Sequence, residues 1–285
     1  MKIGIYGNNY QEAHRDELSR FIGRLRADGF TAAVHADFAD YLSANGIEVA
    51  DSERVEALPA DARMVVSIGG DGTFLQAADW VGSMQTPIMG INTGHLGYLT
   101  GFSFRDTTSI FAALRGSYEL SSRMALRVIS DFVPEGFSPY GLNEISISKG
   151  DTTSMVQIRA SIDGRFMADY QADGLVIATP TGSTAYNLSC GGPIMQPTLD
   201  SIVLSPIAPH SLTQRPLVVA AGSALSFDVR SRGAECHIGV DGRTFSVPAS
   251  GTSLRVTAAP HRVNVVQPAG TDFAAVLRNK LGWGG

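Results

Sequence analysis

Short β-branched runs and segments with helically spaced apolar residues alternate through roughly the first 90 residues of the chain. Strand-like runs occupy residues 2–6, 31–34, 64–68 and 87–91, and helix-like segments occupy residues 14–28, 38–45 and 73–80. Strands that alternate with helices in this way form a parallel sheet with helices on its faces. Residues 1–120 are therefore predicted to form an α/β domain.

From residue 121 onward the pattern changes to short runs rich in Val, Ile and Phe, separated by Gly, Pro, Asp and Ser. Asp-Gly pairs at 163–164 and 241–242 stand between such runs, which is the signature of a tight β-hairpin. Residues 121–264 are therefore predicted to form a mainly-β domain, a β-sandwich. Residues 271–281 return to helical spacing, so the tail 265–285 is expected to pack back on the α/β domain.

Composition narrows the class of protein. The net charge is −5 and no Lys/Arg cluster offsets it, which argues against nucleic acid as a partner. The start lacks the apolar region of a signal peptide and no run reaches membrane-spanning length, so a cytoplasmic protein without a membrane partner is expected. Cys190 and Cys236 are too isolated for a disulfide framework or a Cys-x-x-Cys metal site, and no metal ligands are predicted in the chain.

Three glycines surround one carboxylate between the strand-like run 64–68 and the helix-like segment 73–80: Gly69, Gly70, Asp71, Gly72, followed by Thr73. Backbone N–H groups at such a turn can approach a ligand, and the helix start carries partial positive charge, which suits phosphate oxygens. A carboxylate repels phosphate, so Asp71 indicates chemistry on a hydroxyl or a metal ion beside the phosphate. The alternative is that Asp71 only caps the helix.

Two polar stretches interrupt the β-rich half. Asn143 and Glu144 place an amide and a carboxylate in an apolar run, and residues 173–187 lead from a strand into hydroxyl residues, a glycine and Tyr186. Taken singly, these stretches are typical of a strand edge and a capped helix start. Together they offer polar groups for sugar hydroxyls and a tyrosine face on which a base can stack.

In combination these stretches closely resemble the NAD kinases. The matching segments, in the family's order, are 69–73, 90–98, 143–144, 173–186 and 189–193. The glycine turn alone is shared with diacylglycerol kinases and phosphofructokinases, whereas residues 173–193 are far more specific. The resemblance implies a phosphofructokinase-like α/β domain followed by a β-sandwich domain that binds NAD. It implies transfer of the terminal phosphoryl group of ATP, or of polyphosphate, to the adenosine 2′-hydroxyl of NAD, by a homo-oligomer, often a tetramer.

The resemblance also implies roles for individual residues. Asp71 would face the 2′-hydroxyl, and Gly69, Gly70, Gly72 and Thr73 would lie at the phosphates. The residues implied to contact NAD are Tyr98, Asn143, Glu144, Asp173, Thr181, Thr184, Ala185, Tyr186, Ser189 and Ala208. Because these residues come from both halves of the chain, the site is expected between the domains. A divalent metal ion, Mg²⁺, is expected to bridge the donor's phosphates with few protein ligands.

Two other functions stay open from the residues. A lipid or sugar kinase would share the glycine turn, although the sequence lacks the apolar or basic surface expected of a lipid kinase. A silent NAD-binding regulator would keep the NAD residues, and the intact Asp71 argues against it. An ordinary aspartate, with a pKa of about 3.9, is a weak base for a sugar hydroxyl. Phosphoryl transfer through a loose transition state needs only a weak base, because the hydroxyl proton can leave late.

Overall fold

The computed structural model describes residues 1–9, 14–47, 49, 52–94, 97–150, 153–233 and 235–283. The chain divides into two compact units: unit 1 comprises Met1–Ser122 and Val263–Gly285, and unit 2 comprises Arg123–Arg262. The sequence placed these divisions after residues 120 and 264. Strands β7 (Glu119–Ile129) and β18 (Thr252–Gln267) each run through a division, so each contributes residues to both units.

Unit 1 is built on a parallel sheet with strand order β18-β5-β4-β1-β2-β3 and with β6 beside β5. The strands are β1 (Lys2–Gly7), β2 (Thr31–His35), β3 (Ser52–Val55), β4 (Met64–Ile68), β5 (Ile88–Asn92) and β6 (Phe102–Ser103). The chain runs outward from β1 to β3 and returns to β4 on the other side of β1. The strand order therefore reverses between β1 and β4, the kind of point at which open α/β sheets bind ligands.

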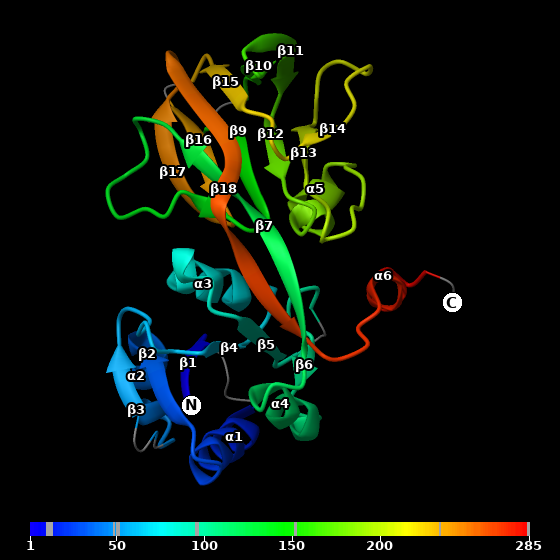
Figure 1. Ribbon diagram of the computed structural model, residues 1–285. Helices are drawn as coiled ribbons and strands as arrows, with labels where there is room; N and C mark the ends of the chain where they lie inside the picture. The colour runs from blue at the N-terminus through cyan, green and yellow to red at the C-terminus, as the bar shows by residue number, and fades with distance from the viewer. Residues whose placement is uncertain are drawn as a thin grey trace. The chain divides into compact units, whose positions relative to one another are not determined.

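Helices cover both faces of this sheet (Figure 1). The helices of unit 1 are α1 (Arg15–Ala27), α2 (Ala36–Ala44), α3 (Asp71–Val81), the short η2 (Gly82–Met84), α4 (Thr107–Leu114) and α6 (Phe273–Leu281). Helices α1 and α4 share one buried cluster with Ile3 and Ile5, which lie on the same face of β1. On the opposite face a Cβ at Gly90 would lie 3.0 Å from the Phe74 ring of α3, so the glycine allows close packing.

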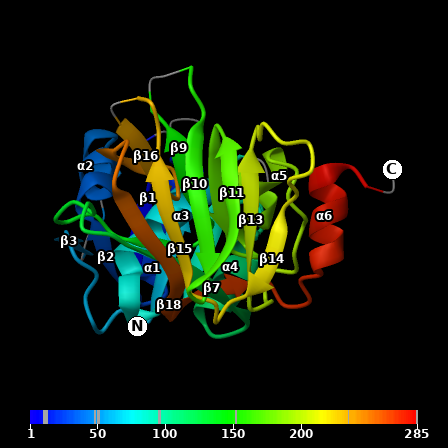
Figure 2. The same ribbon diagram turned by 90° about the horizontal axis from the view of Figure 1, so that it is seen from above.

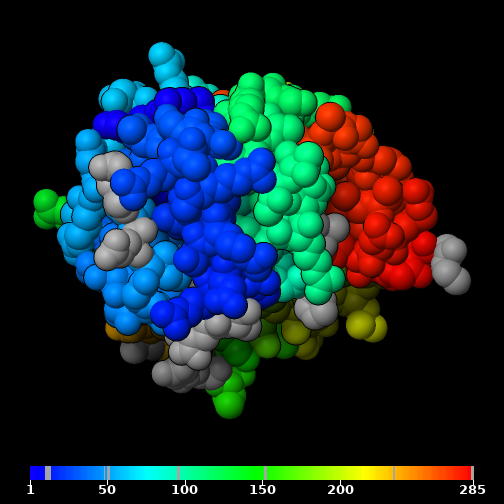
Figure 3. All heavy atoms as spheres, turned by 90° about the horizontal axis from the view of Figure 1, so that it is seen from below, coloured from blue at the N-terminus to red at the C-terminus, as the bar shows by residue number. Residues whose placement is uncertain are grey.

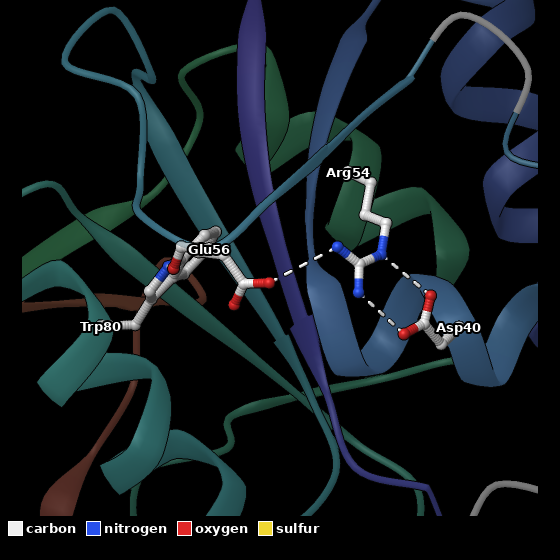
Figure 4. A network of polar contacts seen from close by, with 4 residues as sticks. All are labelled: Asp40, Arg54, Glu56 and Trp80. Carbon is white, nitrogen blue, oxygen red and sulfur yellow. Dashed lines mark hydrogen bonds and ion pairs between the residues drawn. The ribbon is translucent and has the colours of Figure 1, made fainter.

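The outer strand β3 is held by polar contacts at the surface (Figure 4). Arg54 of β3 places Nε and Nη2 each 2.9 Å from the two carboxylate oxygens of Asp40 in α2. Its Nη1 lies 3.4 Å from Glu56, and the Trp80 indole of α3 donates to the Glu56 carbonyl at 2.8 Å. Exposed ion pairs add little stability, so these contacts mainly orient the edge strand.

Unit 2 is a β-sandwich, as predicted, with sheet orders β14-β13-β12-β9-β16-β17 and β11-β10-β15-β18, β7 and β8 continuing the second sheet. The remaining strands are β8 (Tyr140–Gly141), β9 (Glu144–Lys149), β10 (Val156–Ile162), β11 (Arg165–Ala172), β12 (Gly174–Ala178), β13 (Ser201–Ile207), β14 (Leu217–Ala220), β15 (Leu225–Arg230), β16 (Glu235–Val240) and β17 (Arg243–Pro248). Figure 2 shows β15, β10 and β11 side by side. Ile145 and Ile177 from one sheet share a buried cluster with Ile158 and Phe227 from the other.

Both predicted Asp-Gly hairpins are confirmed. Asp163 and Gly164 have φ of 50° and 75° between β10 and β11, and Asp241 and Gly242 have φ of 48° and 81° between β16 and β17. Positive φ at both central residues is the mark of the turn that matches the twist of a β-hairpin. These turns therefore form where the sequence places them.

Three further features concern the cysteines, the length of the helices and the elements that the sequence did not predict. Cys236 is buried, Cys190 is partly buried, and both are free thiols, as expected. No helix in the described part of the chain is long and apolar enough to cross a membrane. The described elements that were not predicted include β3, α4, β13 and β18, as well as the short β6, β8 and η2.

Candidate active site

The glycine turn lies at the carboxyl end of β4, beside the point where the strand order reverses. The Asn8 side-chain amide, just after β1, donates to Thr73 Oγ1 at 3.0 Å, so the segments after β1 and β4 are joined across that point. Gly69 has a φ of 152°, and a Cβ there would collide with the Thr73 hydroxyl. A Cβ on Gly70 or Gly72 would meet nothing within 4 Å, so a ligand has room at both.

The Asp71 carboxylate receives hydrogen bonds from a second turn. The amide of Tyr98 donates to Oδ2 at 2.8 Å, the amide of Leu99 donates to Oδ1 at 3.0 Å, and the Thr100 hydroxyl donates to Oδ1 at 3.2 Å. Gly70 occupies the capping position of α3, and no side chain caps this helix. The alternative that Asp71 is a helix cap is therefore wrong; its structural contact is a brace on the 97–100 turn.

Thr100 and Asn92 support this turn and were not among the predicted site residues. The Thr100 hydroxyl also accepts hydrogen bonds from the Gly97 amide at 3.1 Å and from the Asn92 side chain at 3.3 Å. No local motif connects Thr100 or Asn92 with Asp71, because the hydrogen bond from Thr100 to Asp71 joins positions 29 residues apart. The structure thus links the end of β5, the 97–100 turn and the start of α3 in one network.

Tyr98, predicted to contact NAD, lies on this turn beside Asp71. Its hydroxyl oxygen is buried and has no hydrogen-bond partner among the described residues. Burial, with the nearby charge of Asp71, raises the pKa of the Tyr98 phenol. His95 and Leu96, within the matching segment 90–98, lie outside the described residues.

In unit 2 the structure brings together the two polar stretches. The Thr179 amide donates to the Asn143 carbonyl at 2.9 Å, and the Thr179 hydroxyl donates to the Leu142 carbonyl at 2.6 Å. In the pairing of β9 with β12, Glu144 lies opposite Ala178. Asn143 and Glu144 therefore lie beside the hydroxyl-rich segment that begins at Thr179.

Two buried oxygen atoms of this site have no partner among the described residues: Glu144 Oε2 and Thr181 Oγ1. Burial, with the nearby charge of Asp241, raises the pKa of the Glu144 carboxyl to about 8. Unpaired buried polar atoms are costly, so each such atom needs an explanation. Hydroxyl groups of a bound sugar would satisfy both oxygens.

Asn187 fixes the segment that carries the remaining predicted contacts, which runs through η3 (Gly182–Thr184) and α5 (Tyr186–Ser189). Its side-chain amide donates to the Ser183 carbonyl at 2.9 Å, and its side-chain oxygen accepts from the Ser205 hydroxyl at 2.7 Å. The anchored segment holds Tyr186 with 44% of its surface exposed. Thr184, Ala185 and Ser189 lie on the same segment, so the exposed aromatic ring belongs to a segment with two hydroxyl residues and a small apolar one.

Asp173 and Ala208, the last two predicted contacts, are neighbours across β12 and β13. The Asp173 amide donates to the Ile207 carbonyl at 2.9 Å, and the Asp173 carboxylate lies 2.7 Å from the Lys149 ammonium. Ala208 has a φ of 42°, which is strained for a residue with a Cβ. Strain of about 1–3 kcal/mol is found mainly at functional positions, where the surrounding structure maintains it.

Asp71, its glycine neighbours and Tyr98 belong to unit 1, and the other predicted contacts belong to unit 2. The expectation of a site between the domains stays a prediction. A separate cavity of about 980 Å³ lies in unit 1 beside α1 and includes Arg20, Arg24 and Arg105, but its described lining contains none of the predicted site residues. Figure 3 shows α1, in blue, beside α4, in turquoise-green. Within the described ranges, no three His, Cys, Asp or Glu side chains cluster to hold a metal ion.

A glycine turn at the strand reversal of a parallel sheet, with a carboxylate between glycines that have open space, is the arrangement of a nucleotide-dependent phosphotransferase. The ATP-NAD kinase N-terminal domain family matches residues 26–117, and the ATP-NAD kinase C-terminal domain family matches residues 142–268. The NAD kinase of Bacteroides fragilis is 39% identical over 286 residues, covering 100% of this chain and 98% of the relative. The NAD kinase of Porphyromonas gingivalis is 38% identical, covering 99% and 98%. The chain therefore belongs to the NAD kinase family and is a kinase that phosphorylates NAD.

Solved structures show the same fold. Yeast NADH kinase complexed with NADH superposes with a TM-score of 0.84 at 24% identity, covering 100% of this chain and 88% of that chain. An NAD kinase from Archaeoglobus fulgidus in complex with ATP superposes with a TM-score of 0.76 at 21% identity, covering 99% and 98%. At these identities the likeness concerns the fold.

Proposed function

We propose that this kinase transfers the terminal phosphoryl group of ATP to the adenosine 2′-hydroxyl of NAD at Asp71. The observation that carries this assignment is the setting of Asp71, next to two glycines with open space around them at the strand reversal. Gly69, Gly70, Gly72 and Thr73 would lie at the phosphates, because amides at a helix start favour anions.

Asp71 is proposed to orient the hydroxyl and to take its proton. A carboxylate has about four lone-pair sites. Oδ1 already accepts two hydrogen bonds and Oδ2 accepts one, so Oδ2 can accept one more donor. As the new O–P bond forms and the bond to the leaving ADP oxygen breaks, the hydroxyl proton passes to Oδ2. Charge neutralisation and positioning would supply most of the rate.

The unit 2 residues are proposed to bind NAD. Glu144 and Thr181 would receive sugar hydroxyls, which is supported by their unpaired buried oxygens. Tyr186 offers an exposed ring for stacking. Asn143, Asp173, Thr184, Ala185, Ser189 and Ala208, with Tyr98 of unit 1, would complete the contacts.

Mg²⁺ is proposed to arrive on the phosphates of the donor, as part of the substrate. The described residues offer no cluster of three ligands, which fits an ion held mainly by phosphate oxygens and water. The protein is further proposed to act in the cytoplasm as a homo-oligomer, a tetramer, and to accept polyphosphate as a second donor. Light scattering of the purified chain measures the oligomeric state directly.

The test is incubation of the purified protein with NAD, ATP and Mg²⁺ and measurement of NADP. Parallel reactions replace NAD by NADH, ATP by polyphosphate, or Mg²⁺ by a chelator. NADP formation that depends on ATP supports the proposal. Binding of NAD without turnover would indicate a regulator, and phosphorylation of diacylglycerol or a free sugar in place of NAD would indicate another kinase.

A further inference from the structure

Asp241, outside the residues so far assigned to the site, holds the bend that carries Asn143 and Glu144. Its carboxylate accepts hydrogen bonds from the amides of Leu142 at 2.6 Å, Asn143 at 2.8 Å and Glu144 at 3.0 Å. The Asp241 amide donates in return to the Glu144 carbonyl at 3.1 Å. Three consecutive amides thus converge on one side chain from a hairpin about 100 residues away.

The bend is held from its other side by the Thr179 segment. Besides the two hydrogen bonds from Thr179, the space beside the Asn143 carbonyl is so narrow that a Cβ at Gly182 would collide with it. The bend therefore has little freedom while both supports are present. Without Asp241, three amides would lose their acceptor, and a peptide bend with unsatisfied donors rotates to find others.

The contact of Asp241 is with the backbone of the bend. Its hydrogen bonds use main-chain N–H groups and leave Glu144 Oε2 without a partner among the described residues. A carboxylate that satisfies the backbone thereby keeps the neighbouring side chain available to a ligand. This arrangement is what a binding loop needs if its side chains are to be ready before the ligand arrives.

From this geometry we infer that Asp241 is a positioning residue for NAD binding, which acts by presenting the side chains of Asn143 and Glu144. The inference rests on the proposed role of those two side chains. Asp241 touches none of the reacting atoms of the proposed transfer. Its loss should therefore weaken the affinity for NAD and leave the phosphoryl-transfer step nearly unchanged once NAD is saturating.

The experiment compares Asp241→Asn with Asp163→Asn. Asp163 is a matched control in the same unit, because it occupies the same position of an Asp-Gly hairpin and accepts a hydrogen bond from the Ala224 amide at 2.8 Å. In each variant the dissociation constant of NAD is measured by calorimetry, kcat and the KM of ATP by NADP formation, and the thermal midpoint by melting.

Asp241→Asn is expected to raise the dissociation constant of NAD about tenfold or more, since an amide NH₂ would face backbone donors. The KM of ATP and kcat should stay within about threefold of wild type. Asp163→Asn should change the dissociation constant of NAD less than about twofold. Equal losses for NAD and ATP, or equal effects of the two variants on NAD affinity, would overturn the inference.

A double-mutant cycle with Glu144→Ala separates this inference from the proposed function. If Asp241 acts through the bend, Asp241→Asn should cost less NAD affinity in the Glu144→Ala background than in wild type. If Asn143→Ala and Glu144→Ala both leave NAD affinity unchanged, the proposed NAD site is wrong. If they weaken it and Asp241→Asn does not, the site stands and the positioning role is wrong. Asp241→Ser, which keeps one acceptor oxygen, takes the place of Asp241→Asn if the latter does not fold.

Discussion

Asp71 in unit 1 and Asp241 in unit 2 make the same kind of contact and differ in what remains accessible. Each carboxylate accepts hydrogen bonds from consecutive backbone amides of a turn that carries predicted ligand contacts. Around Asp71, the flanking Gly70 and Gly72 leave open space. Beside Asp241 such space lies only at Gly242, since Val240 on its other side is buried, and burial raises the pKa of the Asp241 carboxyl against the opposing effect of its N–H donors.

The comparison shows that bracing a turn and acting on a ligand are separable properties of one chemical group. Both carboxylates brace, because an ionised carboxylate is a strong acceptor for backbone N–H groups. Asp71 has open space at the glycine on either side of it, whereas Asp241 has open space on one side and the buried Val240 on the other. Glycines on either side of an aspartate therefore indicate that a substrate can approach its carboxylate.

The largest expected effect tests whether Asp71 does more than brace its turn. In Asp71→Asn the side chain can no longer take a proton, so kcat should fall about 10²- to 10⁴-fold. Thr100→Val removes a hydroxyl that supports the same turn and keeps the carboxylate, so its kcat should fall less than about tenfold. Rates of NADP formation, with thermal midpoints, distinguish the two. Similar losses in both variants would leave Asp71 with a bracing role only.

A smaller effect is expected at Tyr186, because the residues of unit 2 are proposed to bind NAD and to take no part in the chemical step. Loss of base stacking in Tyr186→Ala should cost roughly 1–3 kcal/mol, or about 5- to 150-fold in the KM of NAD. Because stacking is the same in the ground and transition states, kcat at saturating NAD should change little. Tyr186→Phe keeps the ring and serves as the control. A large fall in kcat with an unchanged KM would contradict this division between the units.

A further expected effect, on stability and not on catalysis, concerns the Glu144 carboxyl, whose pKa is raised by burial to about 8 in the folded protein. Between the ordinary value of about 4.3 and pH 8, the folded state holds a proton that the unfolded state has lost. Stability from this group therefore falls as the pH rises through that window. The thermal midpoint of Glu144→Gln minus that of wild type should increase from pH 5 to pH 8 and then level off. A difference that stays constant with pH would show that Glu144 ionises normally.

Local patterns predicted much of the fold because local forces form those elements. The strand 64–68 was predicted with the bounds of β4, and both Asp-Gly hairpins have the positive φ values that their turn requires. Among the unpredicted strands, β3 lacks such a pattern, whereas a proline interrupts the apolar pattern of β13 and of β18. Strand β3 reads SERV and has no buried residue, β13 contains Pro206, and β18 contains Pro260. Their strand form comes from pairing with neighbours, for example Pro206 opposite Leu175.

The sequence by itself determined the alternation of strands and helices in the first part of the chain, the β-rich character of the second, the glycine turn, and the residue types available for binding and phosphoryl transfer. The tertiary structure decided the partners of those residues: that Asp71 braces Tyr98 and Leu99 instead of capping its own helix, and that Asp241 holds Asn143 and Glu144. The physical reason is distance along the chain. Turn and helix preferences act over a few residues, whereas these hydrogen bonds join residues 27 to 98 positions apart, and sheet register brings them together.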